Sequence, residues 1–243
     1  MKLPEQGGRD MKYFGCGFNF SQDGPGNRLV YHLSGCNMRC LWCSNPEGFS
    51  CEGGKEITPD QIVTEALRAR AMFFDGGGVT FTGGEATLWH DELLDVLKKL
   101  RGAGIHTAIE TNGTSARLCE LLPHIDYLMM DFKHFDSEKL KKFTGLGCER
   151  VKENFEMLSQ SGRQVHIRIP LISGFNADAP EGFARYFSQW DTSKMDFELL
   201  PYHEYGKGKW TEEYRIQDGF VDAQVLAQFR RIFTQYNLKL KNT

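Results

Sequence analysis

Short runs of apolar residues alternate with longer amphipathic stretches from Arg28 to the end of the chain. This alternation is typical of repeated strand–helix units that build a parallel sheet. Six runs have the length and composition of strands: residues 29–33, 78–81, 107–109, 127–130, 165–169 and 197–200. Six units are fewer than the eight that close a full barrel. The pattern therefore predicts an α/β fold with a partial, splayed (β/α)6 barrel that has an open side.

The stretches between these strands have apolar residues at helical spacing. Thr58 and Pro59 have the residue types of an N-cap and a first helical position, and Ile62, Ala66 and Ala69 follow with helical period. Three further helices are expected over residues 90–101, 178–189 and 222–236. The chain has no internal repeat, low-complexity tract or linker. We expect one domain over residues 1–243, with a core of about residues 21–203 and a C-terminal helix and tail over residues 204–243.

Composition and charge narrow the classes of function. The 243 residues have a formal net charge of -3, with acidic and basic residues mixed along the chain, so we expect no nucleic-acid partner. No apolar stretch suits a signal peptide or a membrane span, which excludes a membrane partner from our prediction. Seven cysteines at uneven spacings fit a reducing compartment better than a disulfide framework. We expect a cytoplasmic monomer.

Three of the cysteines form a compact motif directly after the first expected strand. Cys36, Cys40 and Cys43 are separated by three and two residues, and thiolates at these spacings can each bind one corner iron of a cubane cluster. The local sequence supplies no fourth ligand. The alternative is a structural zinc site completed by Cys51 or His32, although such sites usually use paired Cys-x2-Cys motifs. A ferredoxin-like electron carrier would need four cysteines.

Polar and glycine-rich segments follow the other expected strands. Because the carboxyl ends of parallel strands meet at one edge of a sheet, these segments are expected to lie together. They are Gly83-Gly84-Glu85, Glu110-Thr111-Asn112-Gly113, Asp131-Phe132-Lys133 and Pro201-Tyr202-His203. Read alone, Gly83-Gly84-Glu85 is also compatible with a simple turn. Asp131 and Lys133, read alone, are compatible with an exposed ion pair. Arg168, within an expected strand, faces either the interior or the solvent.

The cysteine motif, with Trp42 just before the third cysteine, resembles that of the radical S-adenosylmethionine superfamily. The turn Asp23-Gly24-Pro25-Gly26, the cysteine motif and the polar segments stand in the order found in activating enzymes of glycyl-radical enzymes. This resemblance, from about residue 21 to the C-terminus, implies a [4Fe–4S] cluster whose fourth iron binds S-adenosylmethionine. It further implies that a 5′-deoxyadenosyl radical removes hydrogen from a backbone glycine of a partner enzyme. Flavodoxin or ferredoxin would donate the electron.

The resemblance also assigns roles to individual residues. Cys36, Cys40 and Cys43 would hold the cluster, and Asp23, Gly24, Pro25 and Gly26 would contact the partner enzyme. The cofactor-binding residues would be Trp42, Gly83, Gly84, Glu85, Glu110, Thr111, Asn112, Lys133, Arg168 and His203, with Trp42 near the adenine unless it is a core residue. A monovalent cation would be bound by Glu110, Thr111, Met129 through its carbonyl, and Asp131. The family has aspartate where this chain has Glu110.

Two features point to different members of this family. Ser44-Asn45-Pro46-Glu47 resembles activating enzymes of glycyl-radical dehydratases and decarboxylases, which usually carry a ferredoxin-like insert before the Gly-Gly-Glu motif. Cys51 is the only cysteine between Cys43 and Gly83, so we expect that insert to be absent. The length of the chain is that of formate-lyase activating enzymes. The alternatives are a radical enzyme acting on a small molecule, such as a deazaguanine synthase, and a non-catalytic iron–sulfur or zinc protein.

Overall fold

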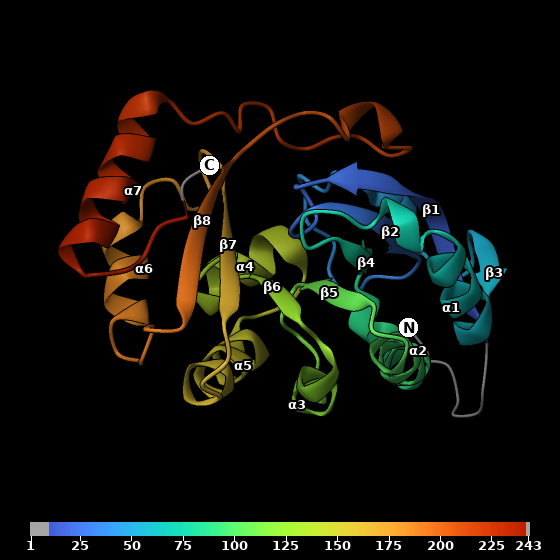
Figure 1. The fold of residues 1–243 in the computed structure, drawn as a ribbon. Helices are drawn as coiled ribbons and strands as arrows, with labels where there is room; N and C mark the ends of the chain where they lie inside the picture. The colour runs from blue at the N-terminus through green and yellow to red at the C-terminus, as the bar shows by residue number, and fades with distance from the viewer. Residues whose placement is uncertain (1–9, 242–243) are drawn as a thin grey trace.

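Eight strands form one open, curved sheet in the computed structural model, which describes residues 10–241 (Figure 1). The order across the sheet is β3-β1-β2-β4-β5-β6-β7-β8. The strands are β1 (Met11–Phe20), β2 (Asn27–Leu33), β3 (Lys55–Ile57), β4 (Gly78–Gly83), β5 (His106–Thr111), β6 (Tyr127–Asp131), β7 (Val165–Leu171) and β8 (Met195–Pro201). The sheet does not close, which confirms the partial barrel.

The six strands that the sequence predicts are the parallel part of this sheet. From β2 through β4 to β8, each strand pairs in parallel with its neighbour. The prediction lacked β1, which pairs with the edge of β2, and β3, which pairs with β1; both pairings are antiparallel. Most of β1 is half-buried or exposed and two glycines interrupt it, so its sequence has no continuous apolar run. β3 is only three residues long.

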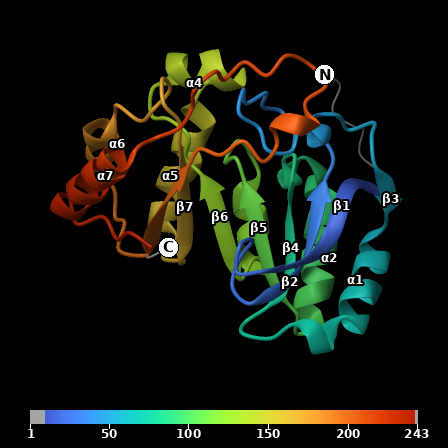
Figure 2. The same cartoon turned by 90° about the horizontal axis from the view of Figure 1, so that it is seen from above.

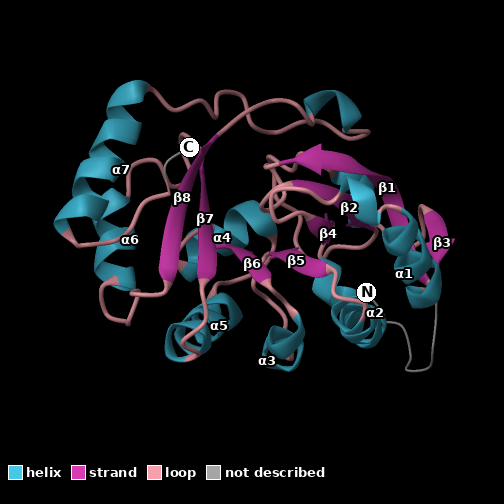
Figure 3. Cartoon of the chain, viewed as in Figure 1, coloured by secondary structure: helices cyan, strands magenta, loops and turns pink. Residues whose placement is uncertain are grey.

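The helices cover the outer face of the sheet (Figure 3). They are α1 (Pro59–Arg68), α2 (His90–Gly102), α3 (Leu118–Leu121), α4 (Ser137–Thr144), α5 (Glu149–Gln160), α6 (Pro180–Phe187) and α7 (Ala223–Gln235). The expected cap of α1 is confirmed, because the Thr58 hydroxyl accepts a hydrogen bond from the Gln61 backbone N–H in a capping box. The Asp222 side chain caps α7 by accepting a hydrogen bond from the Val225 backbone N–H. α6 is shorter than expected, with Pro180 in its first turn.

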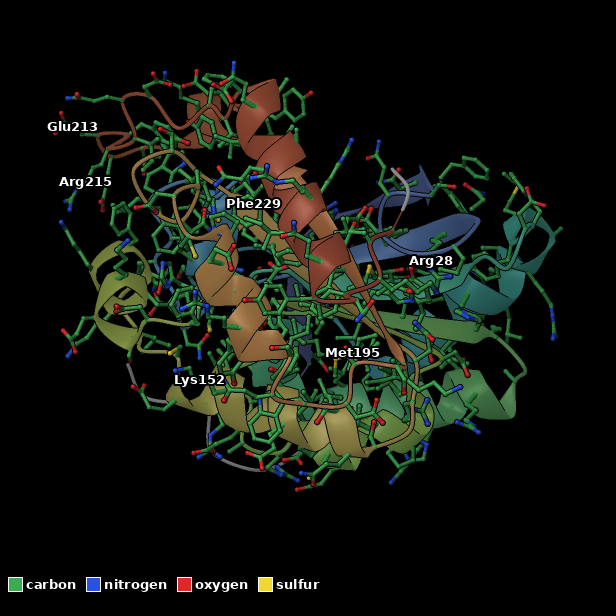
Figure 4. The ribbon with its side chains drawn as sticks, turned by 90° about the vertical axis from the view of Figure 1, so that its left-hand side faces the viewer. Arg28, Lys152, Met195, Glu213, Arg215 and Phe229 are labelled. Carbon is green, nitrogen blue, oxygen red and sulfur yellow. The ribbon has the colours of Figure 1, made fainter. Side chains whose placement is uncertain are left out.

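Aromatic side chains bury the end of the sheet that a full barrel would close. Phe187 of α6 packs on Phe197 of β8 with ring centres 4.7 Å apart, and Phe233 of α7 lies 5.7 Å from Phe197. Figure 4, which labels Phe229 of α7 and Met195 of β8, shows this layer from the side of α6 and α7. Phe229 and Met195 are both buried. The last helices therefore cover β8 instead of continuing the barrel.

All parallel strands point their carboxyl ends toward one edge of the molecule (Figure 2). The register brings Leu33 of β2 beside Gly83 of β4, and Asp131 of β6 beside Arg168 of β7. The loops that carry the expected chemistry therefore leave the sheet at the same edge. No helix in residues 10–241 is long and apolar enough to cross a membrane.

Candidate active site

A cavity opens at the carboxyl ends of the parallel strands. Thirteen of the residues to which the resemblance assigns a role line it: Cys36, Cys40, Trp42, Cys43, Gly83, Gly84, Glu110, Thr111, Asn112, Asp131, Lys133, Arg168 and His203. Three groups do not line it, namely Glu85, Met129 and the turn from Asp23 to Gly26. The sequence analysis missed several lining residues, including Met38, Phe49, Thr82, Pro170, Ile172 and Leu200. Most of these are ordinary apolar side chains, which carry no signal of a site in the sequence.

Backbone hydrogen bonds hold the cysteine loop against the end of α4. The Arg39 N–H donates to the carbonyl of Thr144 at 2.7 Å, and the Leu41 N–H donates to that of Phe143 at 3.1 Å. The Arg39 guanidinium donates to the carbonyl of Cys36 at 2.6 Å from within the loop. The loop is therefore held both by α4 and by its own Arg39, and its three cysteines line the cavity.

The three thiols are poorly suited to carry charge without a metal. Burial raises the pKa of Cys36 and of Cys40 to about 12, and that of Cys43 to about 11. The buried ammonium of Lys133 acts against this by favouring each thiolate. Buried thiols beside an ammonium fit an iron–sulfur cluster, whose positive irons would stabilise the thiolates.

The two residues considered as a fourth zinc ligand lie outside the cavity lining. The Cys51 sulfur packs on Gly35, where an added Cβ would lie 2.3 Å from it, and the His32 ring packs on Phe14 at 5.7 Å. In residues 10–241, no three His, Cys, Asp or Glu side chains are grouped as a single metal ion would need. Thiols that each bind a different iron of a cubane need not converge on one point.

The Gly83-Gly84 segment lies in backbone contact with the cysteine loop. The Gly84 N–H donates to the carbonyl of Leu33 at 2.8 Å, and the Glu85 N–H donates to that of Gly35 at 2.7 Å. A Cβ on Gly84 would lie 2.1 Å from the Gly35 oxygen, so a side chain cannot be accommodated there. Gly83 has φ of +109°, a conformation that also favours glycine. The end of β4 thus presents bare backbone to the cavity.

Arg168 points into the cavity and joins two carboxylates. Its Nη1 lies 2.7 Å from Glu110 Oε1, and its Nε lies 3.0 Å from Asp131 Oδ1. Lys133 Nζ lies 2.6 Å from the other oxygen of Asp131. Burial alone would raise the pKa of Asp131, but Lys133 and Arg168 outweigh it and hold this pKa at about 2. Lys133 is buried and Asp131 half-buried, so their ion pair is not an exposed one.

This network involves the residues expected to bind a monovalent cation. Both carboxylates expected to bind it are paired with Arg168, and the Thr82 hydroxyl donates to the free oxygen of Glu110 at 2.6 Å. Arg168 and Lys133 already supply positive charge to this wall of the cavity. The cation remains a prediction.

Trp42 and His203 lie at different depths of the cavity. The Trp42 ring lines it and also packs on Phe175 at 4.7 Å and Phe143 at 6.5 Å, so it belongs to the core as well as to the site. His203 is an exposed residue at the rim, with its ring stacked on Tyr205 at 4.3 Å. Trp42 is thus fixed by packing, whereas His203 has room to move.

A segment after β8 crosses the loop that follows Cys43, which the sequence analysis did not anticipate. Trp210 Nε1 donates to the Cys43 carbonyl at 3.0 Å, and the Trp210 ring meets Phe49 edge-on at 5.6 Å. Gly206 packs so closely on Ser44 that a Cβ would lie 2.4 Å from it. Lys209 pairs with Glu47. The C-terminal part of the chain therefore covers the cysteine loop.

The turn from Asp23 to Gly26 folds into the barrel. The Thr80 hydroxyl donates to the Asp23 carbonyl at 2.7 Å, and the buried Arg28 guanidinium donates to the Pro25 carbonyl at 3.1 Å. Burial, followed by the charge of Glu110, raises the pKa of Asp23 to about 6. Glu110 lines the cavity, so this turn lies directly behind the cavity wall.

Comparisons with known proteins agree with this geometry. The pattern of the radical SAM superfamily matches residues 30–187. The chain is 34% identical over 244 residues to pyruvate formate-lyase 1-activating enzyme of Escherichia coli K12, covering 96% of this chain and 98% of that protein. It is 31% identical over 283 residues to 4-hydroxyphenylacetate decarboxylase activating enzyme of Clostridioides difficile, covering 87% and 89%. That alignment exceeds the length of this chain, so that relative contains inserted residues.

A solved structure agrees as well. A domain of pyruvate-formate lyase-activating enzyme from Bacteroides vulgatus superposes with a TM-score of 0.59 at 29% identity, over 68% of this chain and 98% of that domain. The chain belongs to the radical SAM superfamily, whose members use a [4Fe–4S] cluster and S-adenosylmethionine. Within that superfamily it belongs to the activating enzymes of glycyl-radical enzymes, since relatives of this kind align along nearly its whole length.

Proposed function

We propose that this enzyme activates a pyruvate formate-lyase or a related glycyl-radical decarboxylase or dehydratase by removing a hydrogen atom from a backbone glycine of that partner. The observation that carries the proposal is the common cavity of three buried thiols, the bare backbone of Gly83 and Gly84, and the ion-pair network of Arg168. The family places a cluster and a methionine-derived cofactor together. The cavity offers suitable groups for both.

Each part of the cavity would hold a different part of the cofactors. Cys36, Cys40 and Cys43 would ligate three irons and leave the fourth for S-adenosylmethionine. When bound, the reduced cluster supplies the electron that cleaves the cofactor's carbon–sulfur bond and yields the radical that abstracts hydrogen. The carbonyls of Gly83 and Gly84 are suited to accept hydrogen bonds from the ammonium group of the methionine part. Lys133 and Arg168 would favour its carboxylate.

The remaining wall of the cavity would orient the cofactor and exclude water. Trp42 would lie near the adenine, and Thr111, Asn112 and His203 would contact the polar parts of the cofactor. The Asp23–Gly26 turn would contact the glycine-bearing loop of the partner. We further propose a single domain, a monomer and a cytoplasmic location, with flavodoxin or ferredoxin as electron donor.

Anaerobic reconstitution tests this function. The iron-loaded enzyme, reduced with dithionite and mixed with S-adenosylmethionine, should form 5′-deoxyadenosine. Adding pyruvate formate-lyase, or in parallel 4-hydroxyphenylacetate decarboxylase, should give a glycine-centred radical signal in electron paramagnetic resonance. 5′-Deoxyadenosine without that signal for any glycyl-radical enzyme would favour a small-molecule substrate. If no 5′-deoxyadenosine forms, the proposed function is wrong.

A further inference from the structure

The carboxylate of Glu85 is surrounded by hydrogen-bond donors of the protein itself. Oε1 accepts from the Thr87 backbone N–H at 3.1 Å, the Thr87 hydroxyl at 2.5 Å and the Thr111 hydroxyl at 2.7 Å. Oε2 accepts from the Asn112 backbone N–H at 2.6 Å. The residue is 1% exposed. Four donors are about as many as a carboxylate accepts.

These hydrogen bonds join the segments that form one wall of the cavity. Gly83 and Gly84 directly precede Glu85, whereas Thr111 and Asn112 end β5, and all four residues line the cavity. The Glu85 backbone N–H also donates to the Gly35 carbonyl beside the cysteine loop. Asn112 continues the connection, because its side chain donates to Asn37 Oδ1 in that loop at 2.9 Å. Glu85 therefore lies at the junction of β4, β5 and the cysteine loop, behind the cavity surface.

We propose that Glu85 is a positioning residue, whose carboxylate fixes the Gly83-Gly84 backbone relative to Thr111 and Asn112 and does not itself receive the cofactor's ammonium group. The proposal rests on the proposed function, since it concerns the site for S-adenosylmethionine. A direct ligand for the ammonium group would need a free acceptor facing the cavity. Glu85 is buried outside the cavity lining, and its donors are protein groups.

Two ligands separate positioning from direct contact in the iron-loaded enzyme. One ligand is S-adenosylmethionine, and the other is an analogue in which hydrogen replaces the α-amino group. The dissociation constant of each ligand is measured anaerobically for the wild type and for Glu85→Gln. The amide cannot accept from all four donors, so the cavity wall should shift. Positioning predicts that both ligands bind about tenfold more weakly, the analogue included, because Thr111 and Asn112 shift together with the Gly83-Gly84 carbonyls. Weakening confined to S-adenosylmethionine would show direct contact and overturn the proposal.

A second variant tests the same proposal if Glu85→Gln does not fold or does not bind iron. Thr87→Val removes one donor to Glu85 at a residue that does not line the cavity. It should weaken both ligands by a smaller factor and speed amide hydrogen exchange in residues 110–114. Glu120→Gln, an exposed carboxylate on α3, is the control and should leave both constants unchanged. Unchanged binding of the analogue, or unchanged exchange, in Thr87→Val would contradict the proposal.

The outcome is distinguishable from a failure of the proposed function. The two dissociation constants depend on binding alone, whereas the proposed function depends on formation of 5′-deoxyadenosine and of a glycine-centred radical. An enzyme that binds both ligands as expected but cleaves nothing would refute the function and leave the role of Glu85 standing.

Discussion

At the scale of single residues, the three cysteines of the site are distinguished from the other cysteines by their surroundings. Cys36 and Cys40 are buried beside the ammonium of Lys133, and all three thiols face one cavity. Cys51 packs on Gly35 outside that lining. The cluster should therefore depend on the three cysteines and not on Cys51.

Replacement of one thiol tests this dependence. Cys40→Ala should yield a protein without the visible absorption of a cluster and with no formation of 5′-deoxyadenosine, because one iron loses its ligand. Cys51→Ala is the matched control and should retain both iron content and absorption. Loss of the cluster in Cys51→Ala would mean that a fourth thiolate completes it and that no iron is open.

Asp23 gives a prediction for the pH dependence of stability. Its pKa is raised to about 6, so the folded protein holds a proton that the unfolded chain releases at about pH 4. The stabilising effect of this proton is complete below about pH 4 and is lost as the pH rises through about 6. Asp23→Asn removes this loss. The variant should exceed the wild type in free energy of unfolding by about 1–2 kcal/mol at pH 7.5, and by less at pH 5.

Urea unfolding at the two pH values measures this difference. Asn can still accept a hydrogen bond from Asn19, as Asp23 does, so packing of the turn should be preserved. Asp178→Asn, an exposed carboxylate, serves as control. An Asp23→Asn variant that is equally destabilised at pH 7.5 and pH 5 would show that the effect does not depend on the proton of Asp23, and would contradict the prediction.

At the scale of elements, the end of β4 and the cysteine loop act as one unit. A Cβ on Gly84 would lie 2.1 Å from the Gly35 oxygen and 2.6 Å from that of Gly48. Gly84→Ala should therefore lower the free energy of unfolding by about 1–3 kcal/mol and reduce the iron content. Gly102→Ala in α2, where nothing lies within 4 Å, should instead raise it by about 0.5–1 kcal/mol. Denaturant unfolding and iron analysis test both, and full iron content in Gly84→Ala would contradict the account.

The segment from Gly206 to Trp210 supports the cysteine loop from the opposite side. Trp210→Phe keeps an aromatic ring against Phe49 but removes the hydrogen bond to the Cys43 carbonyl. A lost hydrogen bond of about 1 kcal/mol should speed loss of the cluster in air by about fivefold. The decay of visible absorption measures this rate. An unchanged rate would show that the segment does not protect the loop.

Sequence reasoning predicted elements with regular patterns and missed those that depend on distant contacts. The six parallel strands have apolar runs, whereas β1 is stabilised by its antiparallel partner β2 and has no such run. The spacing of three cysteines identified a metal site, but only the fold shows that Arg168 faces inward. The packing of Trp210 on the cysteine loop joins residues 167 positions apart, which no local pattern reveals.

At the scale of the whole molecule, the open sheet and the cavity at its carboxyl edge suit a substrate that is itself a protein. The half-buried turn at Asp23 lies next to Glu110 of the cavity wall, so a partner that contacts this turn would also approach the cofactor site. Relatives named as activating enzymes of two different glycyl-radical enzymes align with the chain. Identifying the partner therefore requires an experiment with the candidate proteins.

Transfer of deuterium from the partner tests the central claim most directly. The iron-loaded enzyme is reduced and incubated with S-adenosylmethionine and a glycyl-radical enzyme made with α-deuterated glycine, and the 5′-deoxyadenosine is analysed by mass spectrometry. Abstraction from a backbone glycine predicts 5′-deoxyadenosine carrying one deuterium, together with a glycine-centred radical on the partner. Unlabelled 5′-deoxyadenosine with every candidate partner would contradict the account.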